Sequence, residues 1–258
     1  MRFRHMSLAH RLPEFFRVPL CGRREWSGVT PRADDPDWLA WQKACMRFYT
    51  ETQRSGIGKV VNEKGYRILG RLDLSGLSCL EIGPGSFPHA PFWRGVPAQF
   101  DIADVRKELL DISAASLAAM GVRSRGWHLR DDAVSVPADA ASYDAIIAFY
   151  SLEHLRGLDA WLGEYDRLLK PGGMLIGAVP AEGGLAWGLG RMLTSRRYAR
   201  KNFSYDFDKI TAIEHCNTAE TVLHTLDEKF AVRKRCYWPL RVPCIDCNLV
   251  ISFIYAKL

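Results

Sequence analysis

Four short apolar runs, separated by stretches with helical periodicity, constrain the fold of this chain more than any other feature. The runs are SCLEIG from Ser78, QFDIAD from Gln99, AIIAFY from Ala145 and MLIGAV from Met174. Glycine, proline or charged residues bound each run, which is typical of buried parallel strands. We expect helices over residues 106–120 and 159–169. This alternation predicts an α/β fold with a doubly wound, mostly parallel sheet.

The two ends of the chain depart from this alternation. The runs KFAVRKRCYWPL (229–240) and NLVISFIYAKL (248–258) have no helix between them, so we expect an antiparallel hairpin at one sheet edge. Residues 1–37 are expected to form an irregular arm with one short helix. Residues 38–74 should form a helical cap, whose first helix begins after a capping Asp37.

The lengths of the apolar runs, the cysteine count and the net charge indicate what kind of protein this is. The 258 residues contain no apolar run of the ~18 residues that a membrane span needs, and the first twenty lack a secretory apolar core. We therefore expect a soluble, cytoplasmic protein. Seven scattered cysteines, an odd count, indicate reduced thiols rather than a disulfide framework. A formal charge of +6 mildly favours an anionic partner.

The strongest candidate site begins where the first apolar run meets a glycine-rich turn, Glu81-Ile82-Gly83-Pro84-Gly85. Such a turn lets the backbone approach a ligand, and a following helix would point its amides at that ligand. Asp104 ends the next strand, where it could accept both hydroxyls of a ribose. Pro88 breaks a nicotinamide fingerprint, whereas Glu81 suits a ligand that carries an ammonium group. The pattern points to S-adenosylmethionine.

Further motifs follow this turn in order across residues 75–180: Asp104-Val105-Arg106, the segment RDDAVSVP from Arg130, Ser142-Tyr143-Asp144, Ser151-Leu152-Glu153-His154 and RLLKPGG from Arg167. The ordered set resembles the class I S-adenosylmethionine-dependent methyltransferases. The resemblance implies a seven-stranded, Rossmann-like domain over 75–258. It implies S-adenosylmethionine as cofactor, held by Glu81, Gly83, Pro84, Gly85, Asp104, Val105, Asp132, Ala133 and Tyr150. Phe87 departs from the family, which usually carries a third glycine there.

Two histidines are candidate general bases, should the methyl acceptor be a hydroxyl. His154 follows the strand that ends at Tyr150, and His215 lies farther along the chain. His154 could instead cap a helix or pack against Tyr150. Cys244 and Cys247 raise the alternative of a zinc site, but no second CxxC pair accompanies them. We therefore expect no metal.

A basic segment within an insertion at about 181–215 is the most individual feature. Residues 185–203 contain no acid, and they carry apolar residues that must pack somewhere. We expect a lid that binds an anionic acceptor through Arg191, Arg196, Arg197 and Arg200, because such a cluster needs counter-charge. The alternatives are a solvated basic face and an interfacial helix that contacts an anionic membrane surface.

The expected acceptor is a small or glycan-type anionic molecule, such as a nucleotide-linked or lipid-linked sugar. An RNA methyltransferase is the alternative, although the sequence contains no recognisable RNA-binding module and its basic residues do not form a long stripe. A methyltransferase-like binding protein without turnover is a third possibility. The sequence does not specify the methylated atom or the oligomeric state.

Overall fold

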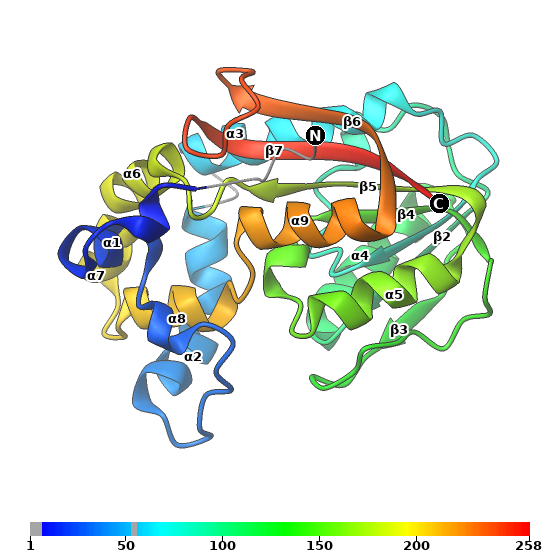
Figure 1. Ribbon diagram of the computed structural model, residues 1–258. Coiled ribbons are helices and arrows are strands. Elements are labelled where there is room, and N and C mark those ends of the chain that lie inside the picture. The colour runs from blue at the N-terminus through cyan, green and yellow to red at the C-terminus, as the bar shows by residue number, and fades with distance from the viewer. Residues whose placement is uncertain (1–6, 53–55) are drawn as a thin grey trace. The chain divides into compact units, whose positions relative to one another are not determined.

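One seven-stranded sheet organises the chain in the computed structural model, which describes residues 7–52 and 56–258 (Figure 1). The strand order is β3-β2-β1-β4-β5-β7-β6. The strands are β1 (Ser78–Ile82), β2 (Gln99–Asp104), β3 (Gly126–His128), β4 (Tyr143–Phe149), β5 (Leu169–Pro180), β6 (Phe230–Pro239) and β7 (Asn248–Lys257). The prediction of a seven-stranded, mostly parallel sheet with an antiparallel C-terminal strand pair is confirmed.

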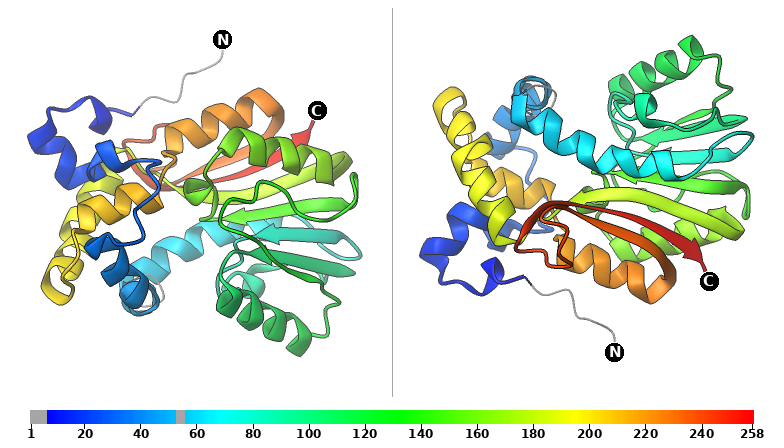
Figure 2. Two further views of the ribbon diagram at one scale, coloured as in Figure 1. Left: turned by 90° about the horizontal axis from the view of Figure 1, so that it is seen from below. Right: turned by 90° about the horizontal axis from the view of Figure 1, so that it is seen from above.

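Nine α-helices occur within the described ranges: α1 (Glu14–Cys21), α2 (Pro36–Thr52), α3 (Gly56–Tyr66), α4 (Lys107–Ala119), α5 (Leu158–Leu168), α6 (Leu185–Leu193), α7 (Ser195–Asn202), α8 (Phe207–Glu214) and α9 (Ala219–Lys229). The predicted helices over 106–120 and 159–169 match α4 and α5 to within one residue. These two helices lie on opposite faces of the sheet, as a doubly wound fold requires (Figure 2).

The parallel register brings the ends of β1 and β2 level with each other. Glu81 pairs with Ile102, and Ile82 pairs with Ala103. On its other side β1 pairs with β4, where Glu81 lies opposite Ile147. Since β1 and its two neighbours are buried along almost their whole length, the sequence needs the continuous apolar runs that it has.

The start of α2 corrects the predicted cap. Pro36 is the first helical residue, and the carboxylate of Asp35 accepts from the backbone N–H groups of Asp37 and Trp38, at 3.0 and 3.2 Å. The cap is therefore Asp35 rather than Asp37. A proline fits the first helical position because its fixed φ suits the helix and its missing N–H would have no partner there.

The chain divides into two compact units. The first comprises residues 1–64, 179–224 and 236–251, and the second comprises 65–178, 225–235 and 252–258. Seven helices (α1, α2, most of α3, α6, α7, α8 and part of α9) belong to the first unit. Strands β1 to β4 and helices α4 and α5 belong to the second. The predicted boundaries of an arm, a cap and a domain over 75–258 stay predictions.

None of the helices in the described ranges combines the length and the apolarity that crossing a bilayer requires.

A buried ion cluster in the first unit involves two of the four arginines that the lid prediction names. Asp208 accepts from Arg191 at 2.6 Å and from Arg196 at 2.8 Å, and the Arg191 side chain is only 2% exposed. Arg191 also donates to the backbone oxygen of Pro19 in α1. Arg191 and Arg196 were predicted to bind an anionic acceptor, but Asp208, which lies beyond the acid-free stretch, already supplies their counter-charge.

The Asp208 carboxyl titrates below its usual range. Burial disfavours its charged form, but hydrogen bonds from Arg196 and the charge of Arg191 outweigh burial and lower its pKa. A carboxyl whose pKa is depressed in the folded state stabilises the fold above its unfolded pKa, roughly pH 4, and that stabilisation is lost as pH falls through the folded pKa. The cluster should therefore contribute fully at neutral pH.

We predict that Asp208→Asn lowers the free energy of unfolding by roughly 3–5 kcal/mol at pH 7, because it leaves the buried guanidinium of Arg191 without a carboxylate. Urea unfolding followed by circular dichroism measures this loss. The difference from the wild type should shrink as pH falls below about 4, where the unfolded carboxyl becomes protonated, and should be lost as pH falls through the lowered pKa of the folded carboxyl.

Asp34→Asn is the matched control, since it removes a carboxylate whose pair with Arg32 is exposed on both sides. Its unfolding midpoint should stay close to the wild-type value. Equal losses in the two variants, or a loss in Asp208→Asn that does not change with pH, would contradict the role of the cluster.

Candidate active site

The candidate site lies where β1 and β2 end, within the second unit. Gly83 follows β1, and its N–H donates to the oxygen of Ala103, the residue before Asp104, at 2.8 Å. Gly83 and Gly85 have φ of 74° and 61°, a left-handed conformation that favours glycine. The turn therefore needs these glycines, and it leaves Glu81 before it and Asp104 beside it.

The segment after the turn differs from the prediction. Residues 83–98, all of which the structure describes, contain no α-helix, and their only helical turn is a short 3₁₀ helix over Ala90–Phe92. The expected helix amides are therefore missing behind the glycine turn. Aromatic residues fill this segment instead, and their packing fixes it against the sheet.

Phe87 stands where the family usually has a third glycine. Its φ of 61° is left-handed, so the backbone keeps the conformation that a glycine would adopt there. The ring is buried, and its centroid lies 4.7 Å from that of His89 and 5.1 Å from that of Phe100. Burial of an aromatic ring offsets the cost of a left-handed non-glycine residue.

Glu81 has a buried partner that the sequence analysis missed. His89 Nε2 lies 2.8 Å from the Glu81 carboxylate, and both side chains are 1% exposed. Trp93 Nε1–H donates to His89 Nδ1 at 3.1 Å. Because Nδ1 accepts, the proton of a neutral imidazole lies on Nε2, which then donates to Glu81. The chain Trp93–His89–Glu81 therefore fixes the orientation of the carboxylate.

Asp104 is also buried, at 6% exposure, and accepts from the backbone N–H of Arg106 at 2.8 Å. Burial raises the pKa of its carboxyl, while that hydrogen bond and the charge of Arg106 act in the opposite direction. The neighbouring Val105 is exposed. A buried carboxylate that accepts from neighbouring backbone N–H groups still has acceptor capacity for a ligand.

Ser151 adds a polar group beside the glycine turn. It is 6% exposed, and its hydroxyl has no hydrogen-bond partner among the residues described. A Cβ at Gly83 would lie 3.2 Å from the Cβ of Ser151, so the serine borders the space that the glycine leaves. A buried hydroxyl without a partner is costly unless a ligand or water satisfies it.

Tyr150 turns toward α3. A Cβ on Gly65 would come within 2.2 Å of its hydroxyl, so this contact requires glycine at position 65. Its ring centroid is 5.6 Å from that of Tyr66, and burial raises its pKa well above the usual value. The predicted cofactor residue Tyr150 therefore directs its phenol to the helix end.

The predicted adenine segment is more open. Asp132 is exposed and forms a two-bond pair with Arg130, at 2.9 and 3.0 Å, which lowers the pKa of its carboxyl. Ala133 is half-buried. The adenine-binding role of Asp132 and Ala133 remains a prediction.

The two candidate bases belong to different units. His154 ends a 3₁₀ helix over Leu152–His154, which follows β4. His215 follows α8, and its Nδ1 is hydrogen-bonded to Glu182, a buried residue two positions after β5. A buried carboxylate bound to one ring nitrogen orients an imidazole. The sequence analysis missed Glu182, which no motif marks.

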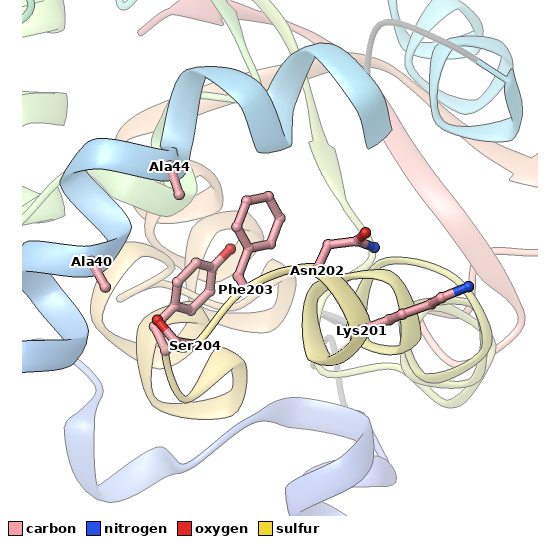
Figure 3. A pocket seen from close by; sticks show the side chains of 7 residues that line it. Ala40, Ala44, Lys201, Asn202, Phe203 and Ser204 are labelled. Atoms are coloured by element: carbon pink, nitrogen blue, oxygen red, sulfur yellow. The ribbon is translucent and has the colours of Figure 1, made fainter.

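The other two arginines that were predicted to bind the acceptor lie on the surface. Arg197 and Arg200, on α7, are both exposed, unlike Arg191 and Arg196. A hollow of about 440 Å³ borders α7 and is lined by Ala40, Ala44 and residues 201–205. Figure 3 shows Phe203 directed toward α2 and the Lys201 side chain directed away from it. Lys201 therefore adds to the outer charge of α7.

Cys244 and Cys247 lie in the loop between β6 and β7 as free thiols. Among the residues described, no group of three histidine, cysteine or acidic side chains has an arrangement that could hold a metal ion.

Comparison with known proteins gives two kinds of likeness. Residues 93–175 match a family model described as a methyltransferase domain. The sterol 4-C-methyltransferase strm-1 of Caenorhabditis elegans is 32% identical over 116 residues, covering 41% of this chain and 32% of that protein. The chain thus spans about a third of the length of this curated relative.

Solved structures share the fold at low identity. An S-adenosylmethionine-dependent methyltransferase from Aquifex aeolicus is 13% identical with a TM-score of 0.55, covering 83% of this chain and 98% of that chain. The [4+2]-cyclase SpnF is 14% identical with a TM-score of 0.53, covering 88% and 97%. Residues 93–175 therefore match a methyltransferase domain, and the chain shares the fold of solved S-adenosylmethionine-dependent methyltransferases.

Proposed function

We propose that the protein transfers a methyl group from S-adenosylmethionine to a small or glycan-type anionic acceptor, such as a nucleotide-linked or lipid-linked sugar. One arrangement carries the proposal. Two buried carboxylates, Glu81 and Asp104, flank the left-handed turn at Gly83 and Gly85. A buried hydroxyl, that of Ser151, borders the same turn without a partner among the described residues.

These residues suit S-adenosylmethionine group by group. Glu81, anchored by His89, offers a carboxylate to the ammonium of the amino-acid end. Asp104 offers acceptors to the two ribose hydroxyls. The hydroxyl of Ser151 can donate to an anionic or carbonyl oxygen that approaches the turn. The adenine would lie against the segment that contains Asp132 and Ala133.

The bound cofactor supplies a methyl group that its sulfonium already activates, so the protein's task is mainly to position the acceptor and exclude water. A hydroxyl acceptor also needs a base within hydrogen-bond reach. His154 and His215 are the candidates. Glu182 orients the ring of His215, and a carboxylate on one ring nitrogen stabilises the protonated imidazole.

Support for the acceptor class comes from two observations. Asp208 pairs with the inner Arg191 and Arg196, whereas Arg197 and Arg200 are exposed, where they can meet an anionic group. The curated relative is named for a sterol, which is a small lipid rather than a nucleic acid. An RNA acceptor and a binding protein without turnover are the alternatives. A protein without methyl transfer is kept as an alternative because the [4+2]-cyclase SpnF, which is not named as a methyltransferase, shares the fold.

Transfer of a labelled methyl group tests the reaction directly. Purified protein is incubated with methyl-labelled S-adenosylmethionine and a panel of nucleotide sugars, lipid-linked sugars, sterols and total RNA. Label in a small-molecule or lipid fraction is the expected result. Label in RNA alone would replace the proposed acceptor, and cofactor binding without any product would favour the binding protein.

We predict that Asp104→Asn weakens binding of S-adenosylhomocysteine and of 5′-methylthioadenosine by similar factors, roughly 10- to 150-fold. The carboxylate accepts from ribose hydroxyls that both ligands have, and hydrogen bonds to a charged group contribute about 1.5–3 kcal/mol. Isothermal titration calorimetry measures both affinities. Unchanged affinities for both ligands would contradict the assigned role.

We predict a different pattern for His89→Phe, which should keep the aromatic packing but remove the hydrogen bond to Glu81. Affinity for S-adenosylhomocysteine should fall by about tenfold or more, because its ammonium then faces a poorly oriented carboxylate. Affinity for 5′-methylthioadenosine should change little, because this ligand has no amino-acid end. The ratio of the two dissociation constants is the measured quantity.

Trp93→Phe and His89→Gln accompany that variant. Trp93→Phe leaves the imidazole in place but removes its outer donor, so it should shift the ratio less. His89→Gln keeps an amide donor and should restore part of the affinity for S-adenosylhomocysteine. If His89→Phe weakens both ligands equally, His89 only maintains the fold and does not position Glu81.

A further inference from the structure

The first unit carries an exposed apolar surface on two helices that contact each other. Helix α1 presents Phe15 and Phe16 at 82% and 58% exposure, and α6 presents Leu189 and Leu193 at 49% and 66%. Single exposed apolar residues are common, but several large ones on two helices that pack together form a candidate binding surface. We call these four residues the apolar strip.

The two helices pack closely. A Cβ on Gly188 of α6 would lie 2.8 Å from the Cβ of Leu20 on α1, and Arg191 of α6 donates to the backbone oxygen of Pro19. Figures 1 and 2 both show α1 beside α6 and α7. Because Gly188 and Arg191 face α1, the inner side of α6 is occupied, and Leu189 and Leu193 extend from another side.

Cations accompany the apolar strip. Arg197, Arg200 and Lys201 of α7 are exposed, as is Arg11 just before α1, whereas Glu14 is the one acid in helices α1, α6 and α7. Asp208 pairs with Arg191 and Arg196 and does not contact these outer cations in any ion pair among the described residues. The surface is therefore apolar and positively charged at once.

We propose that this surface docks the protein onto an anionic lipid bilayer. Phenylalanine and leucine side chains gain free energy by entering the boundary between headgroups and acyl chains, and nearby arginine and lysine are attracted to anionic headgroups. A nucleic acid would attract the cations through its phosphates, but it would not bury the four exposed apolar side chains. A second copy of the surface would carry the same positive charge and repel it.

This docking does not depend on the methyl acceptor, so it can be tested without knowing the reaction. The full chain is mixed with vesicles of phosphatidylcholine alone or with 30% phosphatidylglycerol, at 0.1 M salt, and bound protein is measured by co-sedimentation. We expect binding to the anionic vesicles and much weaker binding to the neutral ones. Total RNA serves as a competitor in a parallel series.

Two double variants separate the two forces. R197Q/R200Q should lower partitioning onto anionic vesicles by roughly 5- to 25-fold, since each cation near the surface contributes about 1 kcal/mol. F15S/F16S should also lower it, and lower salt should not restore its binding to the wild-type level. The circular dichroism spectrum should stay unchanged in both, because the altered side chains are exposed.

Matched controls lie in the second unit. R123Q/R233Q removes the same net charge from exposed positions, and I112S/M120S removes two exposed apolar side chains from α4 and its end. Both should bind vesicles like the wild type. Absence of binding to anionic vesicles, equal losses in the controls, or displacement by RNA would overturn the proposal. Self-association that F15S/F16S abolishes, without vesicle binding, would identify a second copy as the occupant instead.

Discussion

The parallel pairing of β1 with β2 is the constraint on which the candidate active site depends. It brings the ends of two apolar strands to one edge, so Glu81 and Asp104 become buried acids that flank one turn. Two buried carboxylates are unfavourable without donors. Glu81 obtains one from His89, and Asp104 obtains one from the backbone of Arg106. Each acid retains acceptor capacity, which is the electrostatic requirement for a ligand that carries an ammonium group and hydroxyls.

The alternation of strands and helices, which sets the positions of β1 and β2, was predictable from the sequence. The strands are continuous apolar runs with clear boundaries, and parallel pairing follows from their alternation with helices, so the positions of Gly83 and Asp104 could be anticipated. The resemblance to a family added the cofactor. Phe87 also fits this picture, because its left-handed backbone keeps the conformation of the glycine that the family usually carries.

The features that the sequence analysis missed involve contacts between distant residues or segments without regular structure. His89 lies in a segment with little regular structure, and no periodicity shows that its ring meets Glu81. The pairing of Asp208 with Arg191 spans seventeen positions and depends on how α6 and α8 meet, so a count of charges within 185–203 missed it. The choice between Asp35 and Asp37 as cap rested on a two-residue shift of the helix boundary, which local patterns rarely resolve.

The ion cluster also changes how the basic segment should be understood. Its inner arginines stabilise the fold of the first unit, so their presence says nothing about a ligand. The outer cations Arg197 and Arg200 remain exposed, as do Phe15 and Leu193 on the helices that pack with α7 or precede it. A surface that exposes aromatic rings and cations together loses free energy in water, since the rings stay hydrated and the like charges repel. Both costs fall at an anionic lipid surface, whereas a soluble anion would relieve only the second.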